Sequence, residues 1–374
     1  MTAAGRLPRP GSALAAAAPV EPRTILFIRI DRIGDMVLST PALREIKRAF
    51  PGSHLTVLAS RANAPVLDHN PYVDRVCIYP AGSRPFSKWQ LSRRLRLEAF
   101  DLVIDGLDSH DLEPALFARL VRPRLAIGFE GFGREVCFDR AVSGIQCRQG
   151  FIEASFDLLN RIGLEDGNRS PELFLTPSEV CRAEQWLAAH TGGVRLRVGI
   201  HPGAHYETQK WGTSHYADLI RQGRVSDTVE WILIGGPADF ETVEQIRSAA
   251  GGAIPAFVDG DLRRSMALIS RLEALVCNNS GPLHIATALQ IPTVSFMGPT
   301  NATRWWPVGS PARVLRAEQL DCLGCEKGTC PEKNTECMRR ISPKMAWDAL
   351  QEVLSEAGAA CSPGQSVAQA KTAG

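Results

Sequence analysis

The stretch "NNSGPLH" at 278–284 places small polar residues directly before an apolar run with the spacing of a helix. Asn279, Ser280 and Gly281 lie where that helix would begin, and His284 lies within its first turn. A helix N-terminus has unpaired N–H groups and a positive dipole end, which together favour a phosphate. Residues of these types also cap helices and form turns without any ligand. The stretch therefore predicts a helix N-terminus that is either merely capped or built to bind an anion.

A second candidate is Asp35, which follows Gly34 where the first apolar run gives way to a helical pattern. An aspartate at a helix start accepts a hydrogen bond from a free N–H and suits the dipole. A carboxylate at the mouth of a cleft can instead act as a general base. Spacing alone favours the capping interpretation.

Three further residues lie in loops of the second half of the chain. Gly203 permits close approach of the backbone to a ligand, Lys210 offers a positive charge, and Asp239 could accept hydrogen bonds from ribose hydroxyls. Each also has an ordinary interpretation as a turn, a surface side chain or a helix cap. Their joint position at consecutive strand ends is what favours a binding site for a nucleotide-containing donor.

Alternating strand and helix patterns must position these residues. Short β-branched runs such as 23–30, 54–60 and 100–109 alternate with helical spacing, which is typical of a parallel sheet covered on both faces. The alternation restarts at 196–203. We therefore predict an α/β protein with two Rossmann-like, doubly wound domains. Ligands of such sheets bind beyond the carboxyl ends of the strands, so two facing sheets would form one interdomain cleft.

The predicted boundaries divide the chain into four segments. These are a disordered leader at 1–22, a first domain at 23–177, a second domain at 178–357 and a disordered tail at 358–374. The leader contains an alanine run interrupted by prolines, which is a poor signal peptide. No apolar run approaches the roughly 20 residues of a membrane-spanning helix. A cytoplasmic protein is predicted.

Composition excludes several classes of function. The net charge of +2 gives no support to general nucleic-acid binding. Residues 1–150 are nevertheless basic, with 21 Lys and Arg against 15 Asp and Glu, which suits an anionic partner. Neither G-x-G-x-x-G after a strand nor G-x-x-x-x-G-K-[ST] occurs, so a nicotinamide dinucleotide or a P-loop site lacks its main signal. No cofactor is predicted.

Four motifs give the sequence a resemblance to a known family. They are "IRIDRIGDMVLSTPALREIKRAFP", "IHPGAHYETQKWGTSHYADLI", "ILIGGPADFE" and "VCNNSGPLHIATALQIPTVSFMGPTNATRWWP". In this order they resemble glycosyltransferase family 9, the lipopolysaccharide heptosyltransferases. The first and last are specific, whereas the middle two are weak alone.

The resemblance implies a GT-B architecture, with the acceptor on the N-terminal domain and a nucleotide sugar on the C-terminal domain. It implies inverting, metal-independent transfer from ADP-heptose to the inner core of lipopolysaccharide. Asp35 matches the family's catalytic base. Ser280 and Gly281 match the residues that hold the diphosphate, and His284 matches a histidine one turn on.

Two positions depart from the family pattern. The family usually has Lys-x-Trp-Pro in the first loop of the second domain. Aligned on Trp211, this chain has Gln209 at the lysine position, and Lys210 is a candidate replacement. Many members also have Asp where this chain has Asn279, which leaves the donor sugar open.

Two clusters of residues each have two possible roles on the basis of the sequence. Cys322, Cys325, Cys330 and Cys337 could hold a structural zinc ion or be reduced thiols. A basic stretch interleaved with aromatic residues is either a solvated helix face or a surface for an anionic glycolipid acceptor at the inner face of the cytoplasmic membrane. Its basic residues are Arg84, Lys88, Arg93 and Arg94.

Two alternatives to a glycosyltransferase remain at this stage. One is a non-catalytic protein of two domains that closes around a nucleotide or a sugar. The other is a GT-B nucleotide-sugar epimerase, which would form product without an added acceptor.

Overall fold

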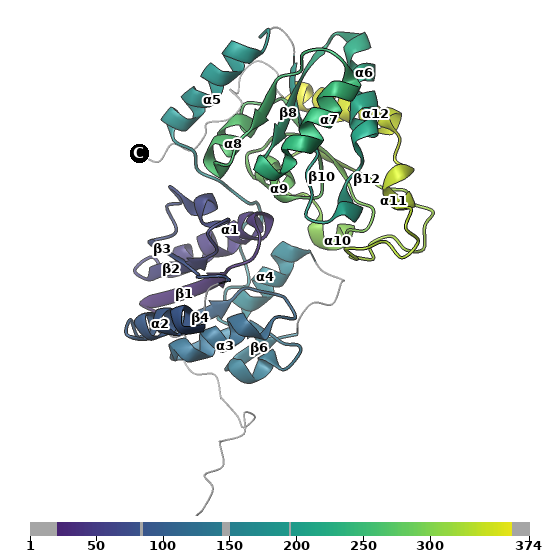
Figure 1. Ribbon diagram of the computed structural model, residues 1–374. Coiled ribbons are helices and arrows are strands. Elements are labelled where there is room, and N and C mark those ends of the chain that lie inside the picture. The colour runs from purple at the N-terminus through teal and green to yellow at the C-terminus, as the bar shows by residue number, and fades with distance from the viewer. Residues whose placement is uncertain (1–20, 83–84, 144–149, 194–195, 361–374) are drawn as a thin grey trace, which may run out of the picture.

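The computed structural model describes residues 21–82, 85–143, 150–193 and 196–360. Arg84 of the predicted basic surface, most of the predicted leader and residues 361–374 of the predicted tail lie outside these ranges. Figure 1 shows two lobes, the first in purple to blue and the second in green to yellow.

The first domain contains a parallel sheet in the order β3-β2-β1-β4-β5-β6. Its strands are β1 (Thr24–Arg29), β2 (His54–Ala59), β3 (Arg75–Ile78), β4 (Leu102–Asp105), β5 (Leu125–Phe129) and β6 (Arg140–Val142). Its helices are α1 (Ile33–Ala49), α2 (Pro85–Arg96), α3 (Leu112–Val121) and α4 (Phe151–Asn160), with 3₁₀ helices η1 (Ala64–Leu67) and η2 (Arg134–Cys137).

The second domain repeats this plan with a parallel sheet in the order β12-β11-β10-β7-β8-β9. Its strands are β7 (Leu196–His201), β8 (Val229–Gly235), β9 (Ala256–Val258), β10 (Ala274–Asn278), β11 (Thr293–Phe296) and β12 (Ala312–Leu315). Its helices are α5 (Pro177–His190), α6 (Thr213–Ser226), α7 (Phe240–Ala250), α8 (Leu262–Ile269), α9 (Gly281–Ala288), α10 (Ala302–Trp305), α11 (Glu336–Arg339) and α12 (Pro343–Ala360), with 3₁₀ helices η3 (Glu207–Gln209) and η4 (Pro237–Asp239).

Each sheet is doubly wound, because its strand order reverses beside the first strand of its domain. The inner strands carry nearly continuous apolar runs, since both faces of a parallel sheet are covered. All five residues of β10 are buried, for example. The prediction of two Rossmann-like, doubly wound domains is confirmed. The sequence patterns did not indicate β5, β6, β9 and β12, which have only three to five residues each.

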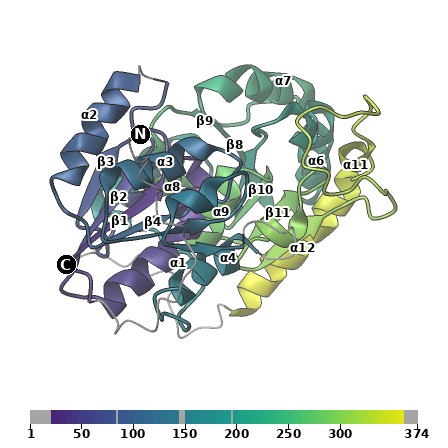
Figure 2. The same ribbon diagram turned by 90° about the horizontal axis from the view of Figure 1, so that it is seen from below.

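Helices cover the two faces of the first sheet in pairs. Helices α2 and α3 pack on one face and α1 and α4 on the other, as both ribbon views show (Figures 1 and 2). In the second domain α6, α7 and α12 cover the outer face, and α8 and α9 cover the inner face. Helix α12 continues through position 358, where the predicted tail begins.

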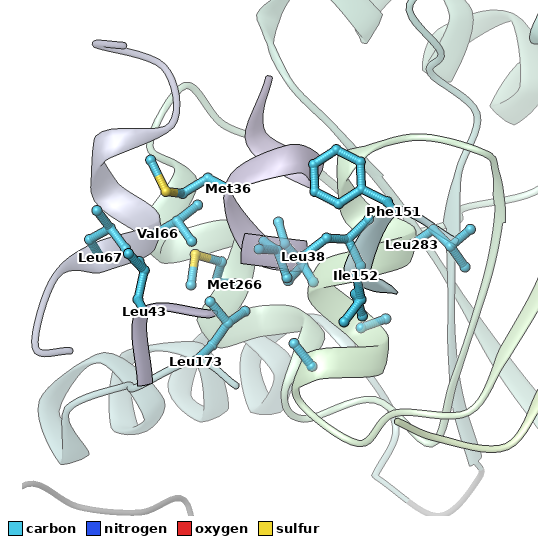
Figure 3. Packing of buried hydrophobic residues seen from close by; sticks show 14 of the residues in the cluster. Met36, Leu38, Leu43, Val66, Leu67, Phe151, Ile152, Leu173, Met266 and Leu283 are labelled. Atoms are coloured by element: carbon cyan, nitrogen blue, oxygen red, sulfur yellow. The ribbon is translucent and has the colours of Figure 1, made fainter. Parts of the chain in front are cut away.

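The inner helix layers of the two domains pack against each other. One apolar cluster includes Met36, Leu38 and Phe151 of the first domain together with Met266 and Leu283 of the second (Figure 3). Because this cluster is continuous, the starts of α1 and α9 are held close together. No described helix has both the length and the apolarity needed to cross a membrane.

Candidate active site

The loop after β1 leads directly into α1 and places Asp35 in the first turn of that helix. Its carboxylate oxygen Oδ2 accepts a hydrogen bond from the backbone N–H of Arg32 at 3.2 Å. Asp35 therefore has the capping contact that its position in the sequence indicates. The side chain is also buried, with a residue exposure of 6%. A buried carboxylate at the carboxyl end of a parallel sheet is well placed for chemistry.

Its surroundings raise the pKa of Asp35 to about 7. Burial is the main cause, because a charge is less stable away from water, and the nearby carboxylate of Asp31 adds to it. Arg29 and Arg32, together with the hydrogen bond from the Arg32 backbone, oppose the shift. A carboxylate that titrates near neutrality can both accept and hold a proton under working conditions.

On the other side of the interface, α9 begins without a side-chain cap. Ser280 is the N-cap residue, but its hydroxyl donates to the backbone carbonyl of Asn278 at 3.4 Å. It accepts no hydrogen bond from the first turn. Pro282 has no N–H, and the N–H of Leu283 donates to the carbonyl of Ser280 at 3.0 Å. The amides of Ser280 and Gly281 and the positive dipole end of α9 are thus left for a ligand, which is the feature that the anion-binding interpretation requires.

Two glycines allow the starts of α1 and α9 to meet. A Cβ atom on Gly34 would lie 2.9 Å from Cδ2 of His284. A Cβ atom on Gly281 would lie 3.3 Å from Cβ of Ile33. Larger residues would therefore push the domains apart at the point where Asp35 faces the second domain.

A cavity of about 290 Å³ lies at this junction. It brings together Asp35 from the first domain and the predicted Asn279, Ser280, Gly281 and His284 from the second. The remaining lining residues are Arg32, Gly34, His205, Tyr206, Gln209, Trp305 and Glu326. A proton acceptor and an anion-binding helix end thus share one interdomain site.

His284 is buried in the wall of this cavity. Burial lowers its pKa to about 4, so the imidazole is neutral at physiological pH. Its Nδ1 atom has no hydrogen-bond partner within the described structure. His284 can therefore donate or accept a hydrogen bond toward a ligand, but it supplies no positive charge.

The sequence of this chain also matches a known protein family. A family model described as glycosyltransferase family 9 (heptosyltransferase) matches residues 88–336. This chain belongs to glycosyltransferase family 9.

Individual relatives agree with this assignment. Lipooligosaccharide heptosyltransferase 2 of Haemophilus influenzae is 25% identical over 352 residues, which are 89% of this chain and 99% of the relative. The crystal structure of a family 9 glycosyltransferase from Veillonella parvula has a TM-score of 0.79 at 20% identity and covers 91% of this chain and 100% of its own. The structure of Escherichia coli ADP-heptose LPS heptosyltransferase II has a TM-score of 0.72 at 21% identity and covers 89% and 99%. The predicted family and the GT-B architecture are confirmed.

In this family 9 glycosyltransferase, Gln209 rather than Lys210 faces the cavity. The loop is anchored by Trp211, whose ring is buried and whose backbone N–H donates to Oδ1 of Asn278 at 3.0 Å. This anchor turns Gln209 toward Thr300, to which its amide donates at 3.3 Å. Lys210 points elsewhere and forms an ion pair with Glu207 at 2.6 Å.

Gly203 and Asp239 lie next to each other, although neither lines the cavity within the described structure. A Cβ atom on Gly203 would lie 2.4 Å from Oδ1 of Asp239. The other oxygen of Asp239 accepts from the backbone N–H of Gly236 at 2.9 Å and lies 3.7 Å from Nε2 of His201. The two predicted residues thus meet in one cluster at the ends of β7 and β8.

Sequence reasoning missed several residues that line the cavity. Arg32 and Trp305 lie inside quoted family motifs, but nothing in the motifs marks them as facing the other domain. Glu326 comes from the cysteine-rich loop and accepts a hydrogen bond from the indole Nε1 of Trp305 at 3.2 Å. The stacking of Trp305 on Phe151 of the first domain, with centroids 5.3 Å apart, closes this wall across the interface.

The four clustered cysteines are free thiols. Burial, together with the neighbouring Cys322, Cys325 and Cys330, raises the pKa of Cys337 to about 11. Across the described ranges, no group of three or more His, Cys, Asp or Glu side chains is arranged to hold a metal ion.

Proposed function

We propose that this glycosyltransferase moves a heptosyl group from ADP-heptose to the inner core of a lipopolysaccharide acceptor, with inversion at the anomeric carbon. The names of its relatives support the sugar, the nucleotide and the acceptor class. The observation that carries the proposal is the interdomain cavity in which Asp35 faces the uncapped start of α9.

In the proposed reaction, Asp35 accepts the proton of an acceptor hydroxyl as that oxygen attacks the anomeric carbon. The bond between this carbon and the diphosphate oxygen breaks, and the electron pair leaves with ADP. One displacement inverts the configuration. The N–H groups and dipole at the start of α9 stabilise the negative charge that develops on the diphosphate, so the step requires no metal ion.

The second domain supplies the donor contacts. Asn279, Ser280 and Gly281 are assigned to the diphosphate, and neutral His284 to a hydrogen bond with the donor. The Gly203 and Asp239 cluster is assigned to the ribose, because its carboxylate lies at the carboxyl ends of β7 and β8. Lys210 is given no role, since Glu207 pairs with its charge.

The donor assignment predicts a specific pattern in a thermal-shift screen of nucleotides and nucleotide sugars. ADP and ADP-heptose should raise the melting temperature most, because a ligand at 100 times its Kd stabilises the folded state by about 2.7 kcal/mol. UDP, GDP and their sugars should raise the melting temperature less. The difference between the shifts with ADP and with AMP measures the contribution of the second phosphate. Transfer from ADP-heptose to heptose-deficient lipopolysaccharide should persist in EDTA. A larger shift with a uridine or guanosine sugar would contradict the donor assignment.

The acceptor would be a glycolipid, and an exposed face on α2 and α3 suits a membrane surface. Phe86 and Trp89 are exposed on α2 and stack with centroids 5.7 Å apart. The guanidinium of Arg93 lies 4.9 Å above the Trp89 ring, and Arg94 is exposed beside it. Lys88 of the predicted basic surface instead pairs with Glu113 of α3.

The neighbouring α3 continues this face with an apolar stripe. Leu112, Leu116 and Leu120 recur at every fourth position and are 38%, 46% and 53% exposed. Exposed apolar patches of this kind mark interaction surfaces, and aromatic rings beside arginines suit an anionic lipid interface. The first domain is therefore assigned to peripheral contact with the inner face of the cytoplasmic membrane.

Charge reversal tests this contact. Arg93→Glu with Arg94→Glu should lower binding to vesicles that contain anionic lipid by about 30-fold or more, because each basic residue near such a surface contributes about 1 kcal/mol and about 1.4 kcal/mol corresponds to tenfold. The matched control is Arg339→Glu with Arg340→Glu, which reverses two exposed charges at the C-terminal end of α11. Equal losses in both variants, or none in either, would show that α2 is not the membrane contact.

A further inference from the structure

A cation would stabilise the departing diphosphate further, beyond the amides and dipole of α9, and among the described residues the second domain places none in the cavity wall. Gln209 occupies the position where the family resemblance predicts a lysine, and Lys210 pairs with Glu207. His284 is neutral at physiological pH. Among the described residues that line the cavity, Arg32 is the one Lys or Arg.

The backbone of Arg32 is held in place directly before α1. Its N–H donates to the Asp35 carboxylate at 3.2 Å, and its carbonyl accepts from the backbone N–H of Met36 at 3.2 Å. The amide of Asn63, which is buried, lies 3.5 Å from the same carbonyl. The origin of the side chain is therefore fixed next to the proposed base.

The side chain of Arg32 reaches across the interface. Its guanidinium carbon lies 5.7 Å from the ring centroid of Tyr206, which belongs to the loop after β7 in the second domain. A guanidinium over an aromatic face is attracted by the ring and stays positively charged. Arg32 is thus directed at the same cavity wall that contains Gln209 and the start of α9.

The charge of Arg32 is also available. Within the described structure it forms no ion pair, whereas Arg29 pairs with Asp31 at 3.1 Å and Arg304 pairs with Asp108 at 3.0 Å. The residue itself is exposed to the cleft. An arginine that is positioned by its backbone, held by an aromatic ring and not engaged in an ion pair is suited to an anionic ligand.

We propose that Arg32 is a catalytic residue that binds the diphosphate of the donor and stabilises its charge as it leaves. The inference rests on the proposed function and extends it. No proton is transferred in this step, because the electron pair of the breaking bond stays on the diphosphate oxygen and the guanidinium remains protonated. Since Arg32 belongs to the acceptor domain and α9 to the donor domain, the leaving-group site is complete only when both domains contribute.

Three variants of the full chain test this role: Arg32→Gln, Gln209→Lys and the two combined. Arg32→Gln should weaken ADP binding tenfold or more with little effect on AMP, and should lower kcat about 10²- to 10³-fold. The combined variant should recover at least tenfold in kcat and in ADP affinity, because the lysine returns a cation to the opposite wall. Arg61→Gln, which removes an exposed arginine after β2, is the matched control and should resemble the unmodified protein.

Two results would overturn the inference. One is an Arg32→Gln protein that discriminates ADP from AMP as the unmodified protein does. The other is a loss of kcat that Gln209→Lys does not repair, which would make Arg32 a structural support for α1. The measurements of ADP and AMP binding do not depend on which sugar the donor carries. If the unmodified protein binds ADP but transfers no heptose, the proposed function fails while the role of Arg32 is still decided by ADP against AMP.

Discussion

Asp35→Asn is expected to lower kcat for heptosyl transfer by about 10³-fold or more while ADP binding stays within a few-fold. Proton transfer by a positioned base contributes 10²- to 10⁴-fold, and the amide of asparagine cannot accept the proton. Its oxygen can still accept the hydrogen bond from the backbone of Arg32, so the start of α1 should keep its structure. Single-turnover transfer and calorimetric binding of ADP measure the two effects separately.

The pH dependence gives an independent check on the same residue. The pKa of Asp35 is about 7, and only the carboxylate form accepts a proton, so kcat/KM should rise with pH up to about 7 and then level off. The control is Ser39→Ala, which removes a buried hydroxyl that donates to the backbone carbonyl of Asp35 at 2.7 Å. This variant should keep the pH profile. Retained turnover in Asp35→Asn, or a profile that is flat between pH 5 and 8, would refute the base assignment.

The raised pKa also predicts a cost in stability. Between the ordinary pKa of 3.8 and the folded value of about 7, the unfolded chain releases this proton and the folded chain keeps it. Stability contributed by this group is therefore lost as pH rises through that window, by on the order of 4 kcal/mol in total. Asp35→Asn should melt at a higher temperature than the unmodified protein at pH 8 but not at pH 4. Such a cost fits the proposed role of Asp35 as a base and not a role in stabilising the fold.

The candidate site could be predicted where function depends on position along the chain. Asp35, Ser280 and Gly281 lie at the starts of the helices that follow buried strands, and parallel strands bring their carboxyl ends to one edge. Local sequence also indicated that α9 would begin near Gly281. It could not decide whether Ser280 caps that helix, because that depends on the direction of its hydroxyl.

Other features depend on contacts between the domains, which leave no local pattern. Gly34 is required because His284 approaches it from the second domain, and Arg32 matters because its side chain reaches Tyr206. The choice between Gln209 and Lys210 depends on the burial of Trp211, which fixes the direction of a short loop. Neighbouring residues on such a loop point different ways, so a shift of one position in the sequence exchanges a cavity residue for a surface residue.

A fully buried ion pair supports the first-domain side of the cleft. Nη2 of Arg134 lies 2.7 Å from the carboxylate of Asp105, and neither side chain is exposed. Arg134 also donates to the backbone carbonyl of Ser109 at 2.6 Å, and Asp105 accepts from the backbone N–H of Leu107 at 3.0 Å. These bonds fix the loop after β4, whose Asp108 pairs with Arg304 of the second domain. The Asp105–Arg134 pair therefore connects the interior of the first domain to the domain interface.

Arg134→Met should destabilise the protein by about 3–5 kcal/mol at pH 8, because it leaves the Asp105 carboxylate buried without a partner. Burial already raises the pKa of Asp105, and the loss of Arg134 should raise it further. The variant can then relieve the penalty by protonation, so its deficit should shrink as pH falls. The measurement is the urea midpoint of the first domain at several pH values.

Arg124→Met, which breaks the exposed pair with Asp101, should cost no more than about 1 kcal/mol. Asp105→Leu combined with Arg134→Met should recover much of the loss, since it removes both charges. If Arg134→Met alone lost no more stability than Arg124→Met, the loop after β4 would be held by packing rather than by this pair.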